Sequence, residues 1–294
     1  MSSKILTAII PCFNIQSDFS NLLDLGLKLN RIPIDLILIV SDPKCSIDDL
    51  VDFKPVFNQI KIYPGASAGQ SRNFGLELVA TDFVWFIDSD DYIVEEFLSL
   101  LTIHIQKENK DIVMAQHYNS NFGILSINRA PTSQKSESLL EALQGDIGVW
   151  RFIFRTQAIR NAKAFFPDLN FGEDLVFLLQ LNSSGATLGF FEHPIYIHNN
   201  RQDSVTYNQI AIRQCVVVLQ IIEDFRSNTQ NSQSSQISTL HARVLASAFL
   251  RANIQNRLRI FGYLLKRFPD SVKWLKTIVV IANNKRKTAT KELS

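Results

Sequence analysis

The sequence has few cysteines, no internal repeat and no long apolar run. Its three cysteines, Cys12, Cys45 and Cys215, are widely spaced and form no Cys-x-x-Cys pair. This pattern excludes a disulfide framework and a zinc knuckle, and it indicates a reducing, cytoplasmic setting. No apolar run approaches the roughly 20 residues that span a bilayer. The first residues, MSSKILTAIIPCFN, are too short for the apolar region of a signal peptide, so we expect a first strand there.

The charge is unevenly distributed along the 294 residues. From His241 to the end, twelve Lys/Arg stand against two acidic residues, a net charge of +10. The remainder holds 18 basic and 26 acidic residues, a net charge of −8. The body and the tail of the chain are therefore expected to have different electrostatic roles.

The first 120 residues alternate short apolar runs, typical of buried strands, with segments that have helical spacing of leucine. Such alternation predicts an α/β fold, with βαβ units around a mostly parallel sheet and helices on both faces. In these sheets ligands bind at the carboxyl ends of the strands, where Asp42 and Asp88 fall. The predicted strands are 5–10, 35–41, 59–63 and 82–88; the predicted helices are 18–29, 46–53 and 67–80, the last capped by Ser67.

The second half has a mixed pattern and then becomes helical. We expect strands at 111–118, 122–128 and 150–155, and helices at 137–145, 173–181 and around 207–226. The thirteen residues 227–239 are polar and without aromatics, which predicts a linker. The expected organisation is therefore a main domain over 1–226, a linker over 227–239, and basic amphipathic helices over 240–294.

The stretch WFIDSDDYI, residues 85–93, ends an apolar strand on three carboxylates, Asp88, Asp90 and Asp91. Two unit charges about 4 Å apart repel by roughly 4 kcal/mol at an effective dielectric constant of 20. Such a cluster favours a bound cation, and carboxylate oxygens suit Mg²⁺ or Mn²⁺. The alternative is a solvated turn in which Asp88 or Asp91 caps a helix that starts near Glu95, and the short pattern alone favours it.

Three further segments carry chemistry, each with a plainer alternative. In SAGQSRNFG (67–75), free amides at the helix start and Arg72 would hold an anion; a surface arginine is the alternative. In FGEDL (171–175), one carboxylate would take a proton from an attacking hydroxyl, or both acids satisfy the helix dipole. YIHNNRQDSVTY (196–207) is predicted as a loop in which His198 contacts a metal or diphosphate, or is structural.

In this order, these segments resemble the inverting family 2 glycosyltransferases with the GT-A fold. The resemblance covers roughly residues 4–206. Its most specific part is residues 67–93, where Arg-Asn-x-Gly is followed about fifteen residues later by an apolar strand and DSDD. It implies a Rossmann-like, mostly parallel central sheet flanked by helices, here with a C-terminal helical extension. The other matching segments are 8–14, 35–42, 150–155, 171–177 and 194–206.

The resemblance implies a role for each matching position. Asp174 matches the general base, with Glu173 beside it. Asp90 and Asp88 would ligate a divalent metal, Mn²⁺ or Mg²⁺, on the diphosphate. The nucleotide-sugar would be bound by Pro11, Asn14, Asp42, Arg72 and Asp88 and by a closing loop with His198, Arg201, Ser204 and Thr206.

The sequence departs from the family in two places. The second strand commonly ends in Asp-Asp-Gly-Ser, whereas here residues 41–44 read SDPK, which leaves the nucleotide base open. The family's Tyr-x-Tyr-Arg stretch is YIHN at 196–199, so that the phosphate contact would pass to His198 or Arg201.

The basic tail favours either of two roles. Amphipathic helices that carry Trp274, Phe261, Tyr263 and Phe268 would bind an anionic membrane surface, at about 1 kcal/mol per basic residue near it. Alternatively they pack on the main domain or form a dimer. The acidic body gives no support to nucleic acid binding.

The resemblance therefore predicts a metal-dependent, inverting sugar transferase of bacterial surface-polysaccharide assembly. Its donor would be a nucleotide-diphosphate sugar, with a UDP-sugar favoured, and its acceptor a glycan or lipid-linked glycan. We expect it in the cytoplasm, with a peripheral place on the inner membrane face as one alternative. A nucleotidyltransferase is a rival, although residues 8–14 lack the Gly-rich basic loop of that class. A nucleotide-sugar-binding protein with a degenerate site is the other rival.

Overall fold

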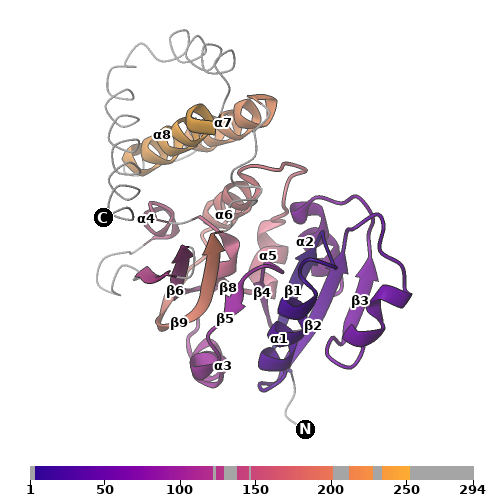
Figure 1. Cartoon of the computed structure of the whole chain (residues 1–294). Coiled ribbons are helices and arrows are strands. Elements are labelled where there is room, and N and C mark those ends of the chain that lie inside the picture. Colours follow the sequence, from indigo (N-terminus) through magenta and orange to yellow (C-terminus); the bar gives the residue numbers. More distant parts are fainter. Residues whose placement is uncertain are drawn as a thin grey trace. The chain divides into compact units, whose positions relative to one another are not determined.

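The computed structural model describes residues 4–121, 124–128, 138–145, 147–200, 212–227 and 234–251 (Figure 1). The chain divides into two compact units. The first unit comprises Met1–Leu169 and Glu173–Arg201. The second comprises Asn170–Gly172 and Gln202–Ser294. Helix α7 (Ile212–Ser227) thus belongs with α8 (Ser234–Arg251) in the second unit, whereas the sequence placed it in a main domain over 1–226.

The described part of the first unit is built on one nine-stranded sheet, in the order β3-β2-β1-β4-β8-β6-β9-β5 with β7 paired to β6. The first four strands in this order are parallel. Strand β8 is antiparallel to both β4 and β6, so β6 runs in the same direction as β4. The strands are β1 Leu6–Cys12, β2 Ile34–Val40, β3 Gln59–Ile62, β4 Phe83–Phe86, β5 Tyr92–Ile93, β6 Ile112–Asn121, β7 Ile124–Asn128, β8 Phe152–Arg155 and β9 Leu188–Asn200.

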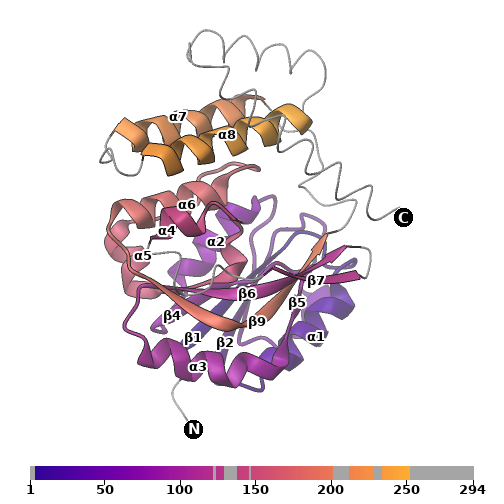
Figure 2. The same cartoon turned by 90° about the vertical axis from the view of Figure 1, so that its left-hand side faces the viewer.

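Helices cover both faces of this sheet. Figure 2 shows α1 and α3 on one face and α2, α4, α5 and α6 on the other. The α/β class expected from the sequence, a central sheet with helices on both faces, is confirmed. The helices are α1 Phe19–Leu29, α2 Ala68–Glu77, α3 Leu98–Lys107, α4 Leu139–Ala142, α5 Thr156–Ala162 and α6 Glu173–Ser183; the 3₁₀ turns are η1 Asp48–Phe53, η2 Glu95–Phe97 and η3 Val149–Arg151.

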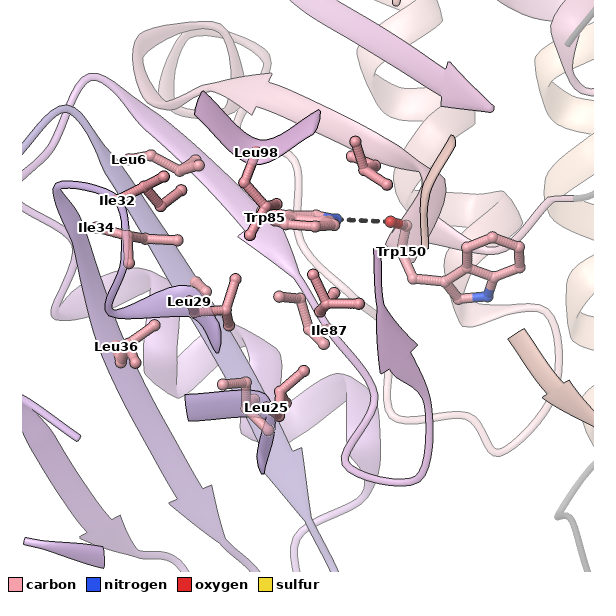
Figure 3. Close-up of a cluster of buried hydrophobic side chains, with 14 of the residues drawn as sticks. Leu6, Leu25, Leu29, Ile32, Ile34, Leu36, Trp85, Ile87, Leu98 and Trp150 are labelled. Carbon is pink, nitrogen blue, oxygen red and sulfur yellow. Dashed lines mark hydrogen bonds between the residues drawn. The ribbon is translucent and has the colours of Figure 1, made fainter. Parts of the chain in front are cut away.

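The core beneath α1 and α3 follows from the two-residue period of the strands. Alternate side chains such as Leu36 and Trp85 point to this face and pack with Leu25 and Leu29 of α1 (Figure 3). Burial of each such side chain stabilises the fold by about 1.5–3 kcal/mol. The Trp85 indole also donates a hydrogen bond of 2.6 Å to the carbonyl of Trp150, which ties β4 to the turn before β8.

Helix α2 is fixed at its start and along its length. Ser67 and Gln70 form a capping box: the Ser67 hydroxyl accepts from the Gln70 N–H, and the Gln70 side chain accepts from the Ser67 N–H. Gly75 lets the helix approach β1, because a Cβ there would lie 2.5 Å from a methyl carbon of Ile9. The predicted cap at Ser67 is confirmed, and the helix start lies beside the carboxyl end of the sheet.

Three local predictions need correction. Within the predicted helix 46–53, residues Asp48–Phe53 form the 3₁₀ turn η1 rather than an α-helix; Ile47 holds its N-cap position and makes no side-chain cap. Residues 196–200 belong to β9 rather than to a loop, because β9 pairs with β6 as far as Asn200. The predicted linker 227–239 is wrong in its second part, where α8 begins at Ser234, because Ile237, Leu240 and Val244 form a buried helical stripe.

The second unit contains a helix pair. Val218, Leu219 and Ile222 of α7 are buried, as are Ile237 and Leu240 of α8, and the two helices pack together. In the ranges that the structure describes, no helix is long and apolar enough to cross a membrane. The three cysteines form no disulfide there.

Candidate active site

The predicted site residues gather at one edge of the sheet because β1, β2 and β4 are parallel. Asn14, Asp42 and Asp88 each lie two residues beyond the end of their strand. The start of α2 lies at the same edge, since it follows β3, which is parallel to β2. The topology therefore brings together positions that are up to 74 residues apart, as the sequence predicted.

Arg72 lies at the centre of a cluster of carboxylates. One guanidinium nitrogen donates to Asp88 Oδ1 over 2.8 Å, and the other donates to Asp174 Oδ1 over 3.1 Å. The second nitrogen also lies 3.6 Å from Glu173 Oε1. The Arg72 side chain is only 4% exposed, against 28% for Asp88. Arg72 is thus a buried bridge between the acidic turn after β4 and the first turn of α6, rather than a surface arginine.

Burial and charge oppose each other in this cluster. Burial lowers the pKa of Arg72, but Asp174, Asp88 and Glu173 together raise that pKa above its ordinary value. Burial, and then the neighbouring Asp174, raises the pKa of Glu173 to about 7, against the attraction of Arg72. Burial also raises the pKa of Asp174, again against Arg72. Two carboxyl groups at the start of α6 therefore hold protons more tightly than ordinary acids do.

Asp174 has a second anchor that the sequence did not predict. Its Oδ2 accepts a hydrogen bond of 3.1 Å from the backbone N–H of Val149, in the turn before β8. Both carboxylate oxygens are therefore oriented, one by Arg72 and one by Val149. Each oxygen has two lone pairs, so each keeps one that can accept a further proton. A carboxylate held in this way is suited to act as a general base.

The acidic turn after β4 uses one of its carboxylates internally. Asp91 is buried, and its two oxygens accept hydrogen bonds from the Tyr196 hydroxyl and the Asn199 N–H of β9. Neither Asp88 nor Asp91 caps the helix that follows, because the N-cap position of η2 is Val94 and has no side-chain bond. The turn is therefore tied to β9 and to Arg72 rather than solvated.

The donor set for a divalent metal at this turn consists of two carboxylates. In the described part of the chain no three His, Cys, Asp or Glu side chains come together to hold an ion. Asp91 is directed toward β9; Asp88, which bonds to Arg72, and Asp90 are half-buried at the sheet edge. Mg²⁺ is usually bound by one or two carboxylates together with substrate phosphate oxygens, so these residues fit a metal that binds with a diphosphate.

On the nucleotide side, the expected residues are engaged in local turns. Pro11 is buried within β1. The Asn14 side chain accepts a hydrogen bond of 3.1 Å from the Ser17 N–H, and the Asp42 carboxylate accepts one of 2.9 Å from the Lys44 N–H. Phe13, which sequence reasoning passed over, is 66% exposed between Pro11 and Asn14. An aromatic ring at the end of the first strand is the signal that would have found it.

His198 is packed against an aromatic side chain. Its ring stacks on Trp150 at a centroid distance of 4.9 Å, and Tyr196 stacks on Trp150 at 4.7 Å. His198 Nδ1 also lies 3.4 Å from Asn119 Oδ1. Arg201, Ser204 and Thr206, the other residues expected to contact the diphosphate, lie outside the described residues.

Comparison with known protein families gives a match over much of this unit. The model of glycosyl transferase family 2 matches residues 7–165. The uncharacterized glycosyltransferase EpsJ of Bacillus subtilis is 24% identical over 216 residues, which cover 69% of this chain and 63% of EpsJ. Poly(ribitol-phosphate) beta-N-acetylglucosaminyltransferase TarS of Staphylococcus aureus is 21% identical over 67% of this chain and 36% of TarS. The chain spans less than two thirds of the length of these curated relatives.

Solved structures share the fold. The crystal structure of S. aureus TarS 1–349 in complex with UDP-GlcNAc has a TM-score of 0.67 at 18% identity, and the match covers 93% of this chain and 79% of that one. Mannosyltransferase PcManGT from Pyrobaculum calidifontis, in complex with GDP-Man and Mn²⁺, has a TM-score of 0.57 at 9% identity, covering 95% and 85%.

Proposed function

Because the chain belongs to glycosyl transferase family 2, we propose that it transfers a sugar from a nucleoside diphosphate sugar to a hydroxyl group of a glycan acceptor. The family predicted from the sequence is confirmed. The match to this family favours sugar transfer over the rival reading as a nucleotidyltransferase. We place the reaction in polysaccharide assembly, in keeping with the acceptor named for the relative TarS, and we favour a UDP-sugar because TarS was solved with UDP-GlcNAc.

The observation that carries this proposal is the fixed position of Asp174. A single displacement at the anomeric carbon needs one base that takes the proton of the attacking hydroxyl as it attacks. Burial raises the pKa of Asp174, against Arg72 and the Val149 N–H, so this carboxylate is more basic than an ordinary aspartate and is held in a fixed orientation. A direct attack of this kind inverts the configuration at the anomeric carbon. Glu173, whose pKa is raised to about 7, is assigned to the sugar or acceptor beside it.

The remaining predicted residues are assigned to the donor. Asp90 and Asp88 would hold Mn²⁺ or Mg²⁺, which when bound neutralises negative charge on the leaving diphosphate. Asn14 and Asp42 follow the ends of β1 and β2 and face the nucleoside in this proposal, with Pro11 at its edge. Arg72 is assigned a place between donor and base, because it bonds to both Asp88 and Asp174. His198, Arg201 and Ser204 are assigned to the diphosphate.

The test combines donor binding with turnover. Thermal shifts with UDP- and GDP-sugars, with and without Mn²⁺, identify the donor, since a ligand of the native state raises the melting temperature. Release of UDP from UDP-GlcNAc is then followed for wild type and Asp174→Asn, with water or an added glycan as acceptor. We expect the variant to bind the donor as wild type does and to release UDP about 100- to 10,000-fold more slowly.

Asp24→Asn, a half-exposed carboxylate on α1 paired with Lys28, is the matched control and is expected to keep full activity. A wild-type protein that binds the donor yet releases UDP no faster than the background without protein is a nucleotide-sugar-binding protein rather than an enzyme. Equal rates for wild type and variant, both well above background, would remove Asp174 from the mechanism.

A peripheral place on an anionic membrane, with a lipid-linked acceptor, is a finer part of the proposal. It is supported by the net charge of +10 from His241 onward. Co-sedimentation of the full chain with vesicles is the test. We expect binding to anionic but not to neutral vesicles, and its loss at high salt. Equal sedimentation with both kinds of vesicle would contradict it, and packing or dimerisation through these helices would then be the better account of the tail.

A further inference from the structure

The sequence block around Arg72 contains a second polar residue, Asn73, which the proposed function does not use. Its side chain forms two hydrogen bonds with the backbone of Phe166, 93 residues later. Asn73 Nδ2 donates to the Phe166 carbonyl over 2.8 Å, and the Phe166 N–H donates to Asn73 Oδ1 over 2.9 Å. A side-chain amide that both donates and accepts in this way copies a backbone partner, so it fixes the position and also the orientation of the segment that it holds.

The same face of α2 is shaped to receive this segment. Gly69 lies one helical turn before Asn73, and a Cβ there would come within 3.0 Å of Phe166 Cβ and 3.2 Å of the Pro167 carbonyl oxygen. The hydroxyl of Ser67, at the N-cap, donates to the Asp168 carboxylate over 3.3 Å. Residues 166–168 therefore lie directly on the first turns of α2.

The ring of Phe166 carries this contact onward to α6. It stacks on Phe177 at a centroid distance of 4.2 Å and an interplanar angle of 4°. Phe177 lies on α6, three residues after Asp174, and therefore on the same side of the helix. The Arg72 guanidinium also lies over the Phe166 ring, 5.4 Å from its centre. Phe166 thus packs between the residue that binds the carboxylates and the helix that presents them.

From these contacts we propose that Asn73 is a positioning residue for the general base. It holds Phe166, Phe166 holds α6 through Phe177, and α6 places Glu173 and Asp174 against Arg72. The two adjacent residues of the Arg-Asn pair then serve one purpose: Arg72 binds the carboxylates directly, and Asn73 fixes the segment and ring on which their helix packs. This inference rests on the proposed role of Asp174.

The experiment compares Asn73→Ala with wild type in UDP release from UDP-GlcNAc. A base that is displaced by a fraction of an ångström slows chemistry but leaves donor binding intact, so we expect kcat to fall about 10- to 100-fold and the donor KM to stay within about twofold. Asn30→Ala is the control, because Asn30 also donates one side-chain hydrogen bond to a backbone carbonyl, that of Val56, at 2.8 Å. It is expected to match wild type in both constants.

Amide hydrogen exchange gives a second readout that does not depend on activity. The Phe166 N–H loses its acceptor in Asn73→Ala and should exchange faster, while Asn30→Ala should leave it unchanged. If Asn73→Ala fails to fold, Asn73→Asp replaces it, since a carboxylate keeps the acceptor for the Phe166 N–H and puts an oxygen, in place of the donor, against the Phe166 carbonyl. The same fall in kcat without a change in KM is expected.

The outcomes separate this inference from the function on which it rests. A wild-type kcat in a folded Asn73 variant, or a rise in donor KM with kcat unchanged, overturns the positioning role. If the wild-type protein itself turns over no donor, the proposed function fails. Hydrogen exchange then remains as the test of the contact between Asn73 and Phe166. Unchanged exchange of the Phe166 N–H in the variant would show that Asn73 does not hold this segment.

Discussion

The hydroxyl of Tyr196 donates a hydrogen bond of 2.6 Å to the carboxylate of Asp91, across 105 positions of sequence. The same hydroxyl accepts a bond of 3.1 Å from the backbone N–H of Asp88. Tyr196 and Asp91 are both buried. Burial, followed by the charges of Asp88 and Asp90, raises the pKa of Asp91 well above its usual value. The Tyr196 hydroxyl therefore bonds to both ends of the acidic turn, at Asp88 and at Asp91, and holds the backbone that carries Asp88 and Asp90.

Removal of this hydroxyl should destabilise the protein. In Tyr196→Phe the ring still stacks on Trp150, but the Asp88 N–H loses its acceptor and the Asp91 carboxylate loses one donor. A buried polar group left without a partner costs about 1–3 kcal/mol, so we expect a loss of that size in the free energy of unfolding. Urea denaturation measures it, and Tyr92→Phe, at an exposed tyrosine of β5, is the control. A loss below about 0.5 kcal/mol would mean that water replaces the hydroxyl.

Replacement of the central cation should be more costly, and the cost should depend on pH. Arg72→Met leaves Asp88, Glu173 and Asp174 close together without a counter-charge. Removal of one partner from a buried ion pair typically costs about 3–5 kcal/mol. The three acids can neutralise themselves by taking up protons, so we expect the full loss at pH 8 and a smaller one at pH 5.

The check for Arg72 is denaturation at both pH values beside Arg160→Met. Arg160 donates a hydrogen bond to the Val79 carbonyl, away from the three acids. Its substitution should have an effect that does not change between pH 5 and pH 8. A pH-independent loss in Arg72→Met would show that the cluster is held by packing on Phe166 rather than by charge.

Much of this arrangement could be predicted from local sequence. The period of apolar residues in the first 90 positions predicted four strands and two of the three helices to within a few residues, because each signal lies within one element. The cap at Ser67 was predicted for the same reason. Placing Asp42 and Asp88 at one edge needed only the rule that parallel strands end together.

The contacts that complete the site could not be predicted in this way. The bonds from Tyr196 to Asp91, from Val149 to Asp174 and from Asn73 to Phe166 join segments 25 to 105 residues apart, and no periodicity records such pairings. The polar composition of 227–239 concealed the apolar stripe that starts at Ile237, because most residues around Ile237 in the first turns of α8 are serine, glutamine or threonine. Composition is averaged over a window of residues, whereas an amphipathic helix is recognised by the spacing of its apolar residues.

The metal prediction is tested at Asp90. Asp90 lies half-buried at the sheet edge and matches the acid that the family resemblance assigns to the metal, so it is expected to be the principal ligand of a divalent ion. Asp90→Asn should weaken the Mn²⁺-dependent part of the UDP thermal shift by about tenfold or more in apparent affinity. It should leave the shift by UDP in EDTA unchanged. Asp24→Asn serves as control, and an unaltered Mn²⁺ effect in Asp90→Asn would remove this residue from the metal site.

The raised pKa of Glu173 predicts the direction in which the stability of the protein changes with pH. Its pKa rises from 4.5 to about 7 on folding, chiefly by burial, so between these values the folded state binds more protons than the unfolded state. Stability therefore falls as pH rises through this window. This difference in pKa corresponds to a loss of stability on the order of 3 kcal/mol at pH 8, since each pKa unit is worth about 1.4 kcal/mol.

Glu173→Gln, which resembles the protonated acid, should avoid this loss. We expect the variant to melt at a higher temperature than wild type at pH 8, and most of the difference to disappear at pH 5, where the folded wild type is already protonated. Arg72 acts against this expectation, because it attracts the charged form of Glu173 and so lowers its pKa, as does a backbone hydrogen bond. A variant less stable than wild type at pH 8 would mean that the attraction between Glu173 and Arg72 outweighs burial.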